Sequence, residues 1–224
     1  MIERIDAADA LNRELDLLED VSHHPDSQHL HFWESLGCLV APMSFKGKPN
    51  FQEAVERLGT AGWPVHSRST GGDATPQGPG IFNLTHVYAN PSGMQIDLAR
   101  EYDRLCTSIE RALGPGASRG WQPGAFCDGA YNVQLNGLKF AGTALRIRRC
   151  KADRNRHAVL AHAIMLAEPV AAEAIRAINT FLTLLGEDRE IEIAAHTHLP
   201  AGLSADVFVG KLTAEIVAVG TRCD

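Results

Sequence analysis

Residues 129–144 read Gly-Ala-Tyr-Asn-Val-Gln-Leu-Asn-Gly-Leu-Lys-Phe-Ala-Gly-Thr-Ala, and this stretch decides the fold. Its Asn136-Gly137 pair is a strong signal for a two-residue hairpin turn, because both residue types tolerate the positive φ that such a turn requires. Outward and inward residues alternate over 131–135, ahead of the turn, and the return strand is expected over 139–148. The chain is therefore predicted to form an antiparallel hairpin whose second strand starts with a lysine.

Helices and strands are expected in mixed order on both sides of this hairpin. The expected strands cover 31–41 (with a turn at Gly37), 65–70, 81–89 and 157–166, and the expected helices cover 6–22, 51–58, 95–113, 169–185 and 204–219. Hairpins beside longer crossovers indicate an α+β (mixed α/β) domain around a mostly antiparallel sheet flanked by helices. We expect a single domain over residues 1–224.

Composition and charge argue against several classes of protein. The formal net charge of -6 gives no support to a nucleic-acid partner or an anionic membrane, since both reward clustered Lys and Arg. No secretory signal and no bilayer-spanning apolar run is visible, and the five cysteines are scattered, so a cytoplasmic setting is expected. No metal site is expected, because His196 and His198 lack further ligands at a set spacing.

A second informative segment ends a strand in consecutive glycines. Residues 68–84 read Arg-Ser-Thr-Gly-Gly-Asp-Ala-Thr-Pro-Gln-Gly-Pro-Gly-Ile-Phe-Asn-Leu. Gly71 and Gly72 let the backbone approach a ligand closely and turn N–H groups toward an anionic oxygen, and Arg68 can add a charge-assisted bond. Taken alone, the segment fits a turn-rich surface loop without a ligand better than it fits a binding site.

The lysine of the hairpin stands among apolar neighbours. Gly142, Thr143 and Ala144 follow Lys139, and such small residues leave room for a ligand to lie across the strand. A lysine in apolar surroundings is a candidate for pairing with a ligand anion, because a buried charge needs a partner. Taken alone, a half-exposed lysine with its charge in water is the more common arrangement.

Together and in this order, the two segments resemble the two signatures of the lipoate–protein ligase A and octanoyltransferase family, within the biotin/lipoate protein ligase superfamily. The resemblance extends to the helix over 12–21, to residues 30–34 with the apolar run 38–41, and to His162 ahead of an apolar strand. It therefore covers most of the chain. It implies a biotin-ligase-like catalytic domain, and the length of the chain leads us to expect no separate C-terminal accessory domain.

The resemblance also implies an enzyme, either a lipoate–protein ligase or a lipoyl or octanoyl transferase, that modifies a lysine of a lipoyl-domain protein. Lys139 would meet the carboxyl end of the acyl chain. The implied substrate-binding residues are Arg68, Ser69, Thr70, Gly71, Gly72, Asn83, Gly142, Thr143, Ala144 and His162. We expect the ligase type, which forms an acyl-adenylate from lipoate or octanoate with ATP and Mg²⁺. An acyl carrier protein would be the donor in the transferase alternative.

Three positions depart from the family pattern. Asp73 stands where the family often has a third glycine, Leu145 where it often has Gln, and Ala163 where it often has Gly. Asp73 would place a negative charge near a phosphate site unless it holds Mg²⁺ or turns outward. These departures bear on substrate choice more than on the fold.

Cys127 is the residue on which the choice between mechanisms depends. Some transferases of this superfamily carry the acyl group as a thioester on a cysteine shortly before the lysine hairpin. A thiolate near Lys139 would be a competent nucleophile, whereas an unpaired cysteine is equally at home as a small buried hydrophobe. A non-catalytic acyl-binding paralogue is the third interpretation.

Overall fold

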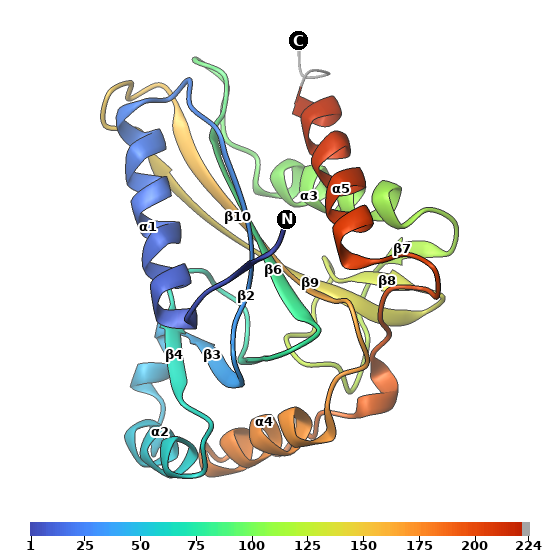
Figure 1. The fold of residues 1–224 in the computed structure, drawn as a ribbon. Coiled ribbons are helices and arrows are strands. Elements are labelled where there is room, and N and C mark those ends of the chain that lie inside the picture. The colour runs from blue at the N-terminus through green and yellow to red at the C-terminus, as the bar shows by residue number, and fades with distance from the viewer. Residues whose placement is uncertain (221–224) are drawn as a thin grey trace.

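A seven-stranded sheet forms the centre of the molecule, in a computed structural model that describes residues 1–220 (Figure 1). Every neighbouring pair of its strands is antiparallel except the short β1–β2 pair, so the predicted mostly antiparallel sheet is confirmed. In sheet order the strands are β1 (Glu3–Arg4), β2 (His29–Glu34), β6 (Ile81–Ala89), β10 (His157–Leu166), β9 (Leu138–Arg149), β8 (Val133–Leu135) and β7 (Ala117–Arg119).

A second, three-stranded sheet has the order β4-β3-β5. It consists of β3 (Cys38–Pro42), β4 (Val65–Arg68) and β5 (Thr75–Gln77). The single strand expected over 31–41 is thus two strands in different sheets, because the chain turns between them. The strand expected over 65–70 ends at Arg68, where the backbone leaves the sheet to form the glycine-rich loop.

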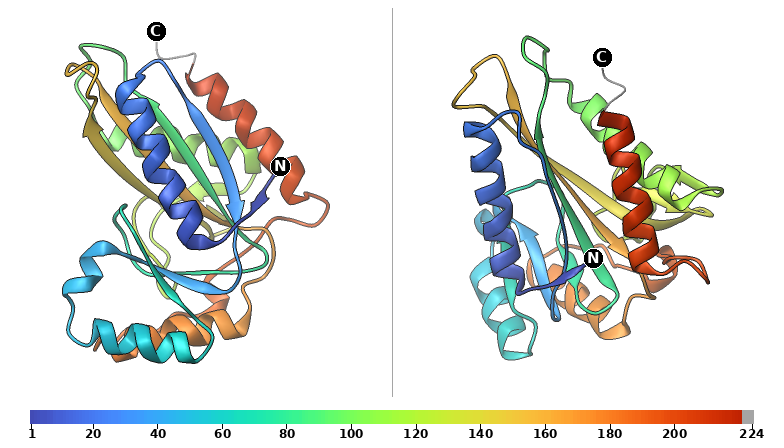
Figure 2. Two further views of the ribbon diagram at one scale, coloured as in Figure 1. Left: turned by 60° about the vertical axis from the view of Figure 1, so that its left-hand side comes forward. Right: turned by 45° about the horizontal axis from the view of Figure 1, so that its top comes forward.

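Helices cover both faces of the large sheet, as Figures 1 and 2 show. One face is covered by α1 (Ala7–His23), and the other by α3 (Leu98–Leu113) and α5 (Ala205–Gly220), while α2 (Phe51–Thr60) and α4 (Ala172–Leu184) pack together beside the small sheet. Two short 3-10 helices, η1 (Met43–Gly47) and η2 (Ile193–Ala195), complete the described elements. The predicted α+β class is confirmed.

Capping residues set where two of these helices begin. The Asp6 side chain accepts from the N–H of Ala8 at 2.8 Å, and the Asp97 side chain accepts from the N–H of Ala99 at 3.0 Å. Each cap satisfies a backbone donor that has no partner within the helix. The helix expected from residue 95 therefore starts only at Leu98.

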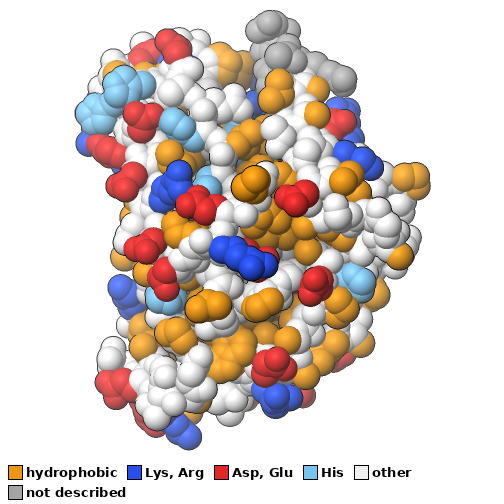
Figure 3. All heavy atoms as spheres, in the orientation of Figure 1, with side chains coloured by type: hydrophobic (Ala, Val, Ile, Leu, Met, Phe, Trp, Pro, Cys, Tyr) orange, Lys and Arg blue, Asp and Glu red, His pale blue; other side chains and the backbone are white. Residues whose placement is uncertain are grey.

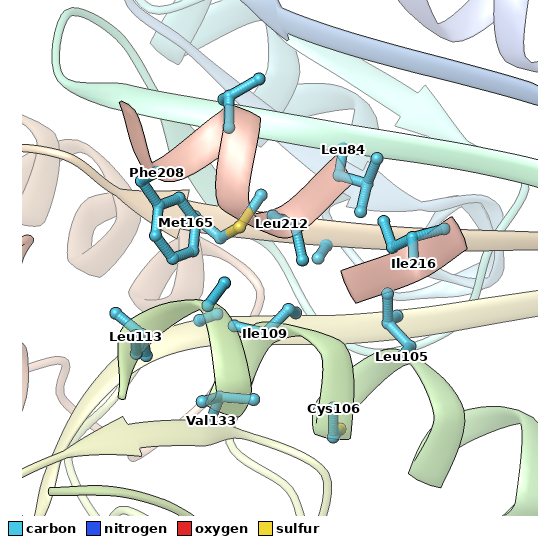
Figure 4. Packing of buried hydrophobic residues seen from close by; sticks show 14 of the residues in the cluster. Leu84, Leu105, Cys106, Ile109, Leu113, Val133, Met165, Phe208, Leu212 and Ile216 are labelled. Carbon is cyan, nitrogen blue, oxygen red and sulfur yellow. The ribbon is translucent and has the colours of Figure 1, made fainter. Parts of the chain in front are cut away.

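The largest hydrophobic cluster lies between the large sheet and the α3–α5 pair (Figure 4). Phe208 on α5 is fully buried and packs edge-on against Phe82 and Phe140, with ring centroids 6.2 and 5.5 Å apart. The residues of this cluster that Figure 4 labels are Leu84, Leu105, Cys106, Ile109, Leu113, Val133, Met165, Phe208, Leu212 and Ile216. Apolar side chains fill this side of the sheet, so we expect a binding or catalytic site on the other side.

A β-bulge turns Lys139 away from that cluster. Lys139 pairs with Gln134, but Ala141 pairs with Val133, so Phe140 is an extra residue in β9. Phe140 and Ala141 consequently both join the α3–α5 cluster. Lys139 then projects from the opposite face, on the same side as Gly142, where an added Cβ would lie 3.2 Å from its Nζ atom. The bulge therefore determines which compartment receives the amine.

The surface shows no dominance of one charge sign on the face drawn in Figure 3, where acidic and basic side chains alternate. Histidines gather near the end of α1, where His23 and His24 pair with Glu19 and Asp20 one helical turn earlier. In the part of the chain that the structure describes, no helix has the length and apolar character needed to cross a membrane.

Replacing Phe208 by Ala should destabilise the fold by about 3–5 kcal/mol, because it removes a fully buried aromatic ring and leaves a cavity. Urea denaturation followed by circular dichroism measures the change. The neighbouring Val207 is 52% exposed, so Val207→Ala is the matched control and should change the unfolding free energy by less than about 1 kcal/mol. Equal effects of the two substitutions would contradict the assigned core.

Candidate active site

The loop after β4, residues 69–74, is folded around the side chain of Arg68. The buried guanidinium donates to the carbonyl oxygens of Gly71 and Asp73 at 2.9 and 2.6 Å, and to that of Val40 at 3.1 Å. Three carbonyl contacts fix both the start and the end of the loop. Arg68 thus holds these residues, called the glycine loop here, in place.

Cys127 lies directly against the glycine loop, although it is 54 residues from Asp73 in sequence. Its Sγ atom accepts from the Asp73 N–H at 3.3 Å and from Arg68 Nη2 at 3.9 Å. A Cβ added at Gly72, whose φ is +96°, would lie 2.9 Å from this sulfur. Glycine at position 72 therefore allows the loop to close on the thiol.

Lys139 reaches the same place from β9. Its side chain is 1% exposed, and Nζ donates to the carbonyl oxygens of Phe126 and, at 2.7 Å, Cys127. Burial lowers the pKa of Lys139 to about 8, although the negative charges of Cys127, Asp128 and Asp73 oppose the shift. The amine is still mostly protonated at neutral pH. An ammonium group has three hydrogens, so one is left for a ligand.

Lys139 is therefore buried, and not half-exposed with its charge in water, which is the more common arrangement for a lysine on a hairpin strand. Its contacts instead hold the backbone of Cys127 in a left-handed conformation, with φ at +48°. Such a conformation is uncommon for a residue other than glycine, and it clusters at functional sites. The lysine, the cysteine and the glycine loop are thus in mutual contact, and we call them together the cysteine–lysine site (residues 68–74, 126–128 and 139).

A row of small residues follows Lys139 along β9. Gly142 and Ala144 share its face of the sheet, opposite Ile164 and His162 of β10. Thr143 faces the other way, and its hydroxyl donates to the carbonyl oxygen of Tyr131 at 2.8 Å. The structure therefore brings two of the three predicted small residues onto the face of Lys139 and places the third on the opposite one.

The remaining predicted loop and strand residues have distinct surroundings. The Asn83 amide is fully buried and donates to Gln77 at 2.7 Å, which ties β6 to β5. Ser69 offers its carbonyl oxygen to Arg146 at 3.3 Å. The Thr70 hydroxyl is buried and has no hydrogen-bond partner among residues 1–220, which is costly unless a ligand supplies one.

His162 belongs to a buried polar network that the sequence did not reveal. Its Nδ1 atom lies 2.7 Å from the carboxylate of Glu14, which also accepts from the Thr85 hydroxyl at 2.8 Å. Burial raises the pKa of Glu14, but the charge of His162 and the hydrogen bonds from His162 and Thr85 lower it further than burial raises it. The carboxylate is 1% exposed and charged, so it fixes the orientation of the His162 ring.

The leucines of the first helix predict an apolar face through Leu11, Leu15 and Leu18 with Glu14 on the polar side, and the structure shows this prediction to be wrong. Leu15 is 41% exposed, while Glu14 points inward with Leu11 and Leu18. The buried face of the helix contains residues 11, 14, 18 and 21. A glutamate at helical spacing from three apolar residues was therefore the sequence signal for a buried carboxylate.

Residues 186–199, called the strap here, pass over the cysteine–lysine site. The His196 ring stacks on Phe126 with centroids 4.5 Å apart, and its Nε2 accepts from the Phe126 N–H at 3.2 Å. Its Nδ1 then carries the hydrogen and donates to the carbonyl oxygen of Glu192 at 2.9 Å. Burial lowers the pKa of His196 to about 4, in agreement with this neutral form. The sequence alone points to His196 only as an incomplete metal ligand, and not as a partner of Phe126.

Within the described residues, no three His, Cys, Asp or Glu side chains converge in a way that could hold a metal ion. The negative charge of Asp73, expected to disturb a phosphate site, is paired with Arg189 of the strap. Asp73 Oδ1 also accepts from the N–H of Ala74 at 2.7 Å. Asp73 therefore presents its backbone, and not a free carboxylate, to Cys127.

Comparison with known proteins gives a consistent result. The family described as the lipoyl protein ligase A/B catalytic domain matches residues 6–185. An uncharacterized protein of Cupriavidus necator is 34% identical in an alignment 199 residues long, and the alignment covers 83% of this chain and 77% of that protein. The octanoyl-[GcvH]:protein N-octanoyltransferase of Kyrpidia tusciae is 34% identical in an alignment 158 residues long, and the alignment covers 65% of this chain and 53% of that enzyme.

The chain thus matches about half the length of that octanoyltransferase. Among solved structures, a putative lipoate protein ligase from T. acidophilum with bound lipoic acid has a TM-score of 0.67 at 15% identity. The alignment covers 99% of this chain and 84% of that one. At this identity the likeness concerns the fold, and it confirms the predicted resemblance to lipoate–protein ligases in architecture.

Acidification should destabilise the protein through His196. Its pKa is about 4 in the folded state and 6.5 by reference, so the unfolded chain binds one more proton between these values. The free energy of unfolding should fall as pH drops from about 6.5 to about 4, by at most about 3 kcal/mol from this group. Urea titrations at several pH values measure it. His196→Asn should flatten this dependence and His198→Asn should not; an unchanged slope in His196→Asn would contradict the assignment.

Proposed function

The chain belongs to the lipoyl protein ligase A/B catalytic domain family, a family of enzymes, and on that premise we propose that it transfers an octanoyl or lipoyl group through a thioester on Cys127. The acceptor would be a lysine of a lipoyl-domain protein. The observation that carries this proposal is the position of the Cys127 sulfur, 3.3 Å from a backbone N–H and 3.9 Å from a guanidinium nitrogen. We also propose that residues 1–224 act as one catalytic domain.

The surroundings of the sulfur suit a nucleophilic thiolate. A thiolate is stabilised by donors and positive charges, and Asp73 N–H, Arg68 and Lys139 provide both kinds. The side chain is only partly buried, whereas Cys38, Cys106 and Cys150 are buried. Burial raises the pKa of Cys38 and Cys106 to about 11, so these two thiols stay protonated. Among the four cysteines that the structure describes, Cys127 is thus the one suited to react with an acyl group.

The proposed first step joins the sulfur to the acyl carbon. The Cys127 thiolate attacks the carbonyl carbon of an acyl-lysine, a C–S bond forms, and the negative charge moves to the carbonyl oxygen. The C–N bond then breaks as the departing amine gains a proton from water. The third hydrogen of Lys139 is available to stabilise the oxyanion, and removing such a donor typically costs about 10²–10³ in rate.

The second step returns the thiol to its starting state. The amine of the acceptor lysine attacks the thioester, a C–N bond forms, the C–S bond breaks, and a proton passes from the amine to water. The exchange converts one amide into another, so it needs no ATP. The name of the Kyrpidia tusciae relative gives octanoyl-[GcvH] as donor, and we propose an acyl donor of the same kind here.

An ATP-dependent ligase is the second candidate. Its supporting observation is the buried, protonated Lys139 beside the glycine loop, which also suits the carboxyl end of an acyl-adenylate. The relevant chemistry would then use lipoate or octanoate with ATP and Mg²⁺. A non-catalytic acyl-binding protein would need neither Cys127 nor Lys139.

Transfer should depend on Cys127 and not on ATP. With an octanoylated lipoyl domain as donor and an apo lipoyl domain as acceptor, wild-type protein should move the acyl group without ATP, as followed by mass spectrometry. Cys127→Ala should lower the rate at least about 10³-fold, because it removes the nucleophile. Cys38→Ala, at a buried cysteine outside the site, is the control. Full transfer by Cys127→Ala would sink the thioester route, and pyrophosphate release from lipoate and ATP would establish the ligase.

Formation of the thioester should decline above about pH 8. Lys139 has a pKa of about 8, so at higher pH it loses the charge that stabilises the oxyanion. Single-turnover acylation of Cys127 across pH 6–10 measures this falling limb. Lys139→Arg keeps a positive charge over the whole range and should remove the limb, while Lys139→Met should be slow at every pH. A falling limb that persists unchanged in Lys139→Arg would show that another group causes it.

A further inference from the structure

The strap contacts every part of the cysteine–lysine site, although it lies beyond the residues matched by the family, 6–185. The N–H of Glu192 donates to the carbonyl oxygen of Gly124 at 2.8 Å, and the N–H of Thr197 donates to that of Lys139 at 2.8 Å. His196 holds Phe126 by the stacking and hydrogen bond described above. These contacts anchor the cysteine and the lysine, and a fourth contact involves the glycine loop.

That fourth contact is the ion pair between Arg189 of the strap and the carboxylate of Asp73. Asp73 is the residue whose N–H donates to the Cys127 sulfur at 3.3 Å. Its carbonyl oxygen is held by Arg68 at 2.6 Å. The side chain and the backbone of Asp73 are therefore fixed from two sides, and the sulfur lies beside the fixed residue.

Arg189 is itself held at a defined place. Glu187 lies 3.5 Å from its Nε atom, and Lys48 pairs with the same Glu187 at 2.5 Å. The side chain of Arg189 is 39% exposed and that of Asp73 is 16% exposed, so the pair is partly shielded from water. A chain of alternating charges thus runs from Lys48 through Glu187 and Arg189 to the glycine loop.

Loss of Arg189 would act on the sulfur in two ways. The carboxylate of Asp73 would be left without its partner close to Cys127, and a negative charge there disfavours the thiolate. The loop would also lose one of the two contacts that hold its end, leaving only the bond from Arg68 to the Asp73 carbonyl, so the N–H would spend less time at the sulfur. Both effects reduce the thiolate fraction at neutral pH, and both operate through Asp73.

We propose that Arg189 is a positioning residue for acyl transfer, which holds the N–H of Asp73 on the sulfur of Cys127 by way of the Asp73 carboxylate. This inference rests on the proposed function, because it assigns to the strap the task of activating the nucleophile. It makes the strap part of the active site and not only a connection between α4 and α5.

The test measures the reactivity of Cys127 without any turnover. Iodoacetamide alkylation of Cys127 is followed by peptide mass spectrometry from pH 5 to pH 10 in the full chain. Arg189→Gln should slow alkylation at pH 7 by about three- to tenfold, in line with typical coupling between residues in contact, and move the midpoint of the profile to higher pH. Arg189→Lys should restore most of the rate, and Arg176→Gln, at an exposed arginine of α4, should match the wild type.

A double-mutant cycle tests the route through Asp73. In an Asp73→Asn background, which removes the charge but keeps the backbone N–H, Arg189→Gln should have little further effect. An unchanged pH profile in Arg189→Gln, or the same loss in both backgrounds, would overturn the inference. Circular dichroism and urea unfolding identify a variant that is merely misfolded, and in that case the comparison of Arg189→Lys with the wild type decides.

The outcome separates this inference from the proposed function. If Cys127→Ala is inactive and Arg189→Gln has the wild-type alkylation profile, the positioning role fails and the thioester route stands. If Cys127→Ala keeps full transfer activity, the thioester route fails whatever the alkylation rates show.

Discussion

A buried positive charge organises the cysteine–lysine site. Lys139 is almost completely removed from water, and a charge in that position requires polar partners. The partners are the carbonyl oxygens of Phe126 and Cys127. Both oxygens point toward Nζ while the backbone of Cys127 is in the left-handed conformation. That backbone in turn directs the sulfur to the glycine loop. The backbone of Phe126 and Cys127 therefore does two things at once: it supplies hydrogen-bond acceptors to the ammonium group and it positions the thiol.

Four separate regions of the chain complete this arrangement. The small sheet supplies Arg68, the hairpin supplies the lysine, the loop before it supplies the cysteine, and the strap closes over all three. Each region is anchored in a different part of the fold, so the geometry of the site depends on the packing between the two sheets and α4. Glu14 and His162 extend the polar surroundings along the same face of the large sheet as Lys139.

The sequence predicted what depends on local pattern. Asn136 and Gly137 have φ values of +53° and +80°, as the hairpin turn required, and the strand over 157–166 was placed at its true bounds. It did not predict Glu14, whose partner His162 is 148 residues away. Nor did it predict the roles of His196 and Arg189, because periodicity indicates which face is buried but not which distant side chain meets it. The family resemblance pointed to Lys139 and the glycine loop, and the structure brings them together with Cys127.

The extra residue in β9 has a consequence for how such a protein can change over time. A strand that alternates regularly assigns each side chain to a layer by parity, and the bulge at Phe140 resets that parity once, between the amine and the hydrophobic residues after it. Deleting the codon for Phe140 would restore regular alternation with Gln134 still opposite Lys139 and Val133 still opposite Ala141, so the amine would keep its layer. A strand that lost the bulge but kept all its residues would instead turn Lys139 toward the hydrophobic layer, so β9 can be shortened at this point but cannot be straightened without moving the amine.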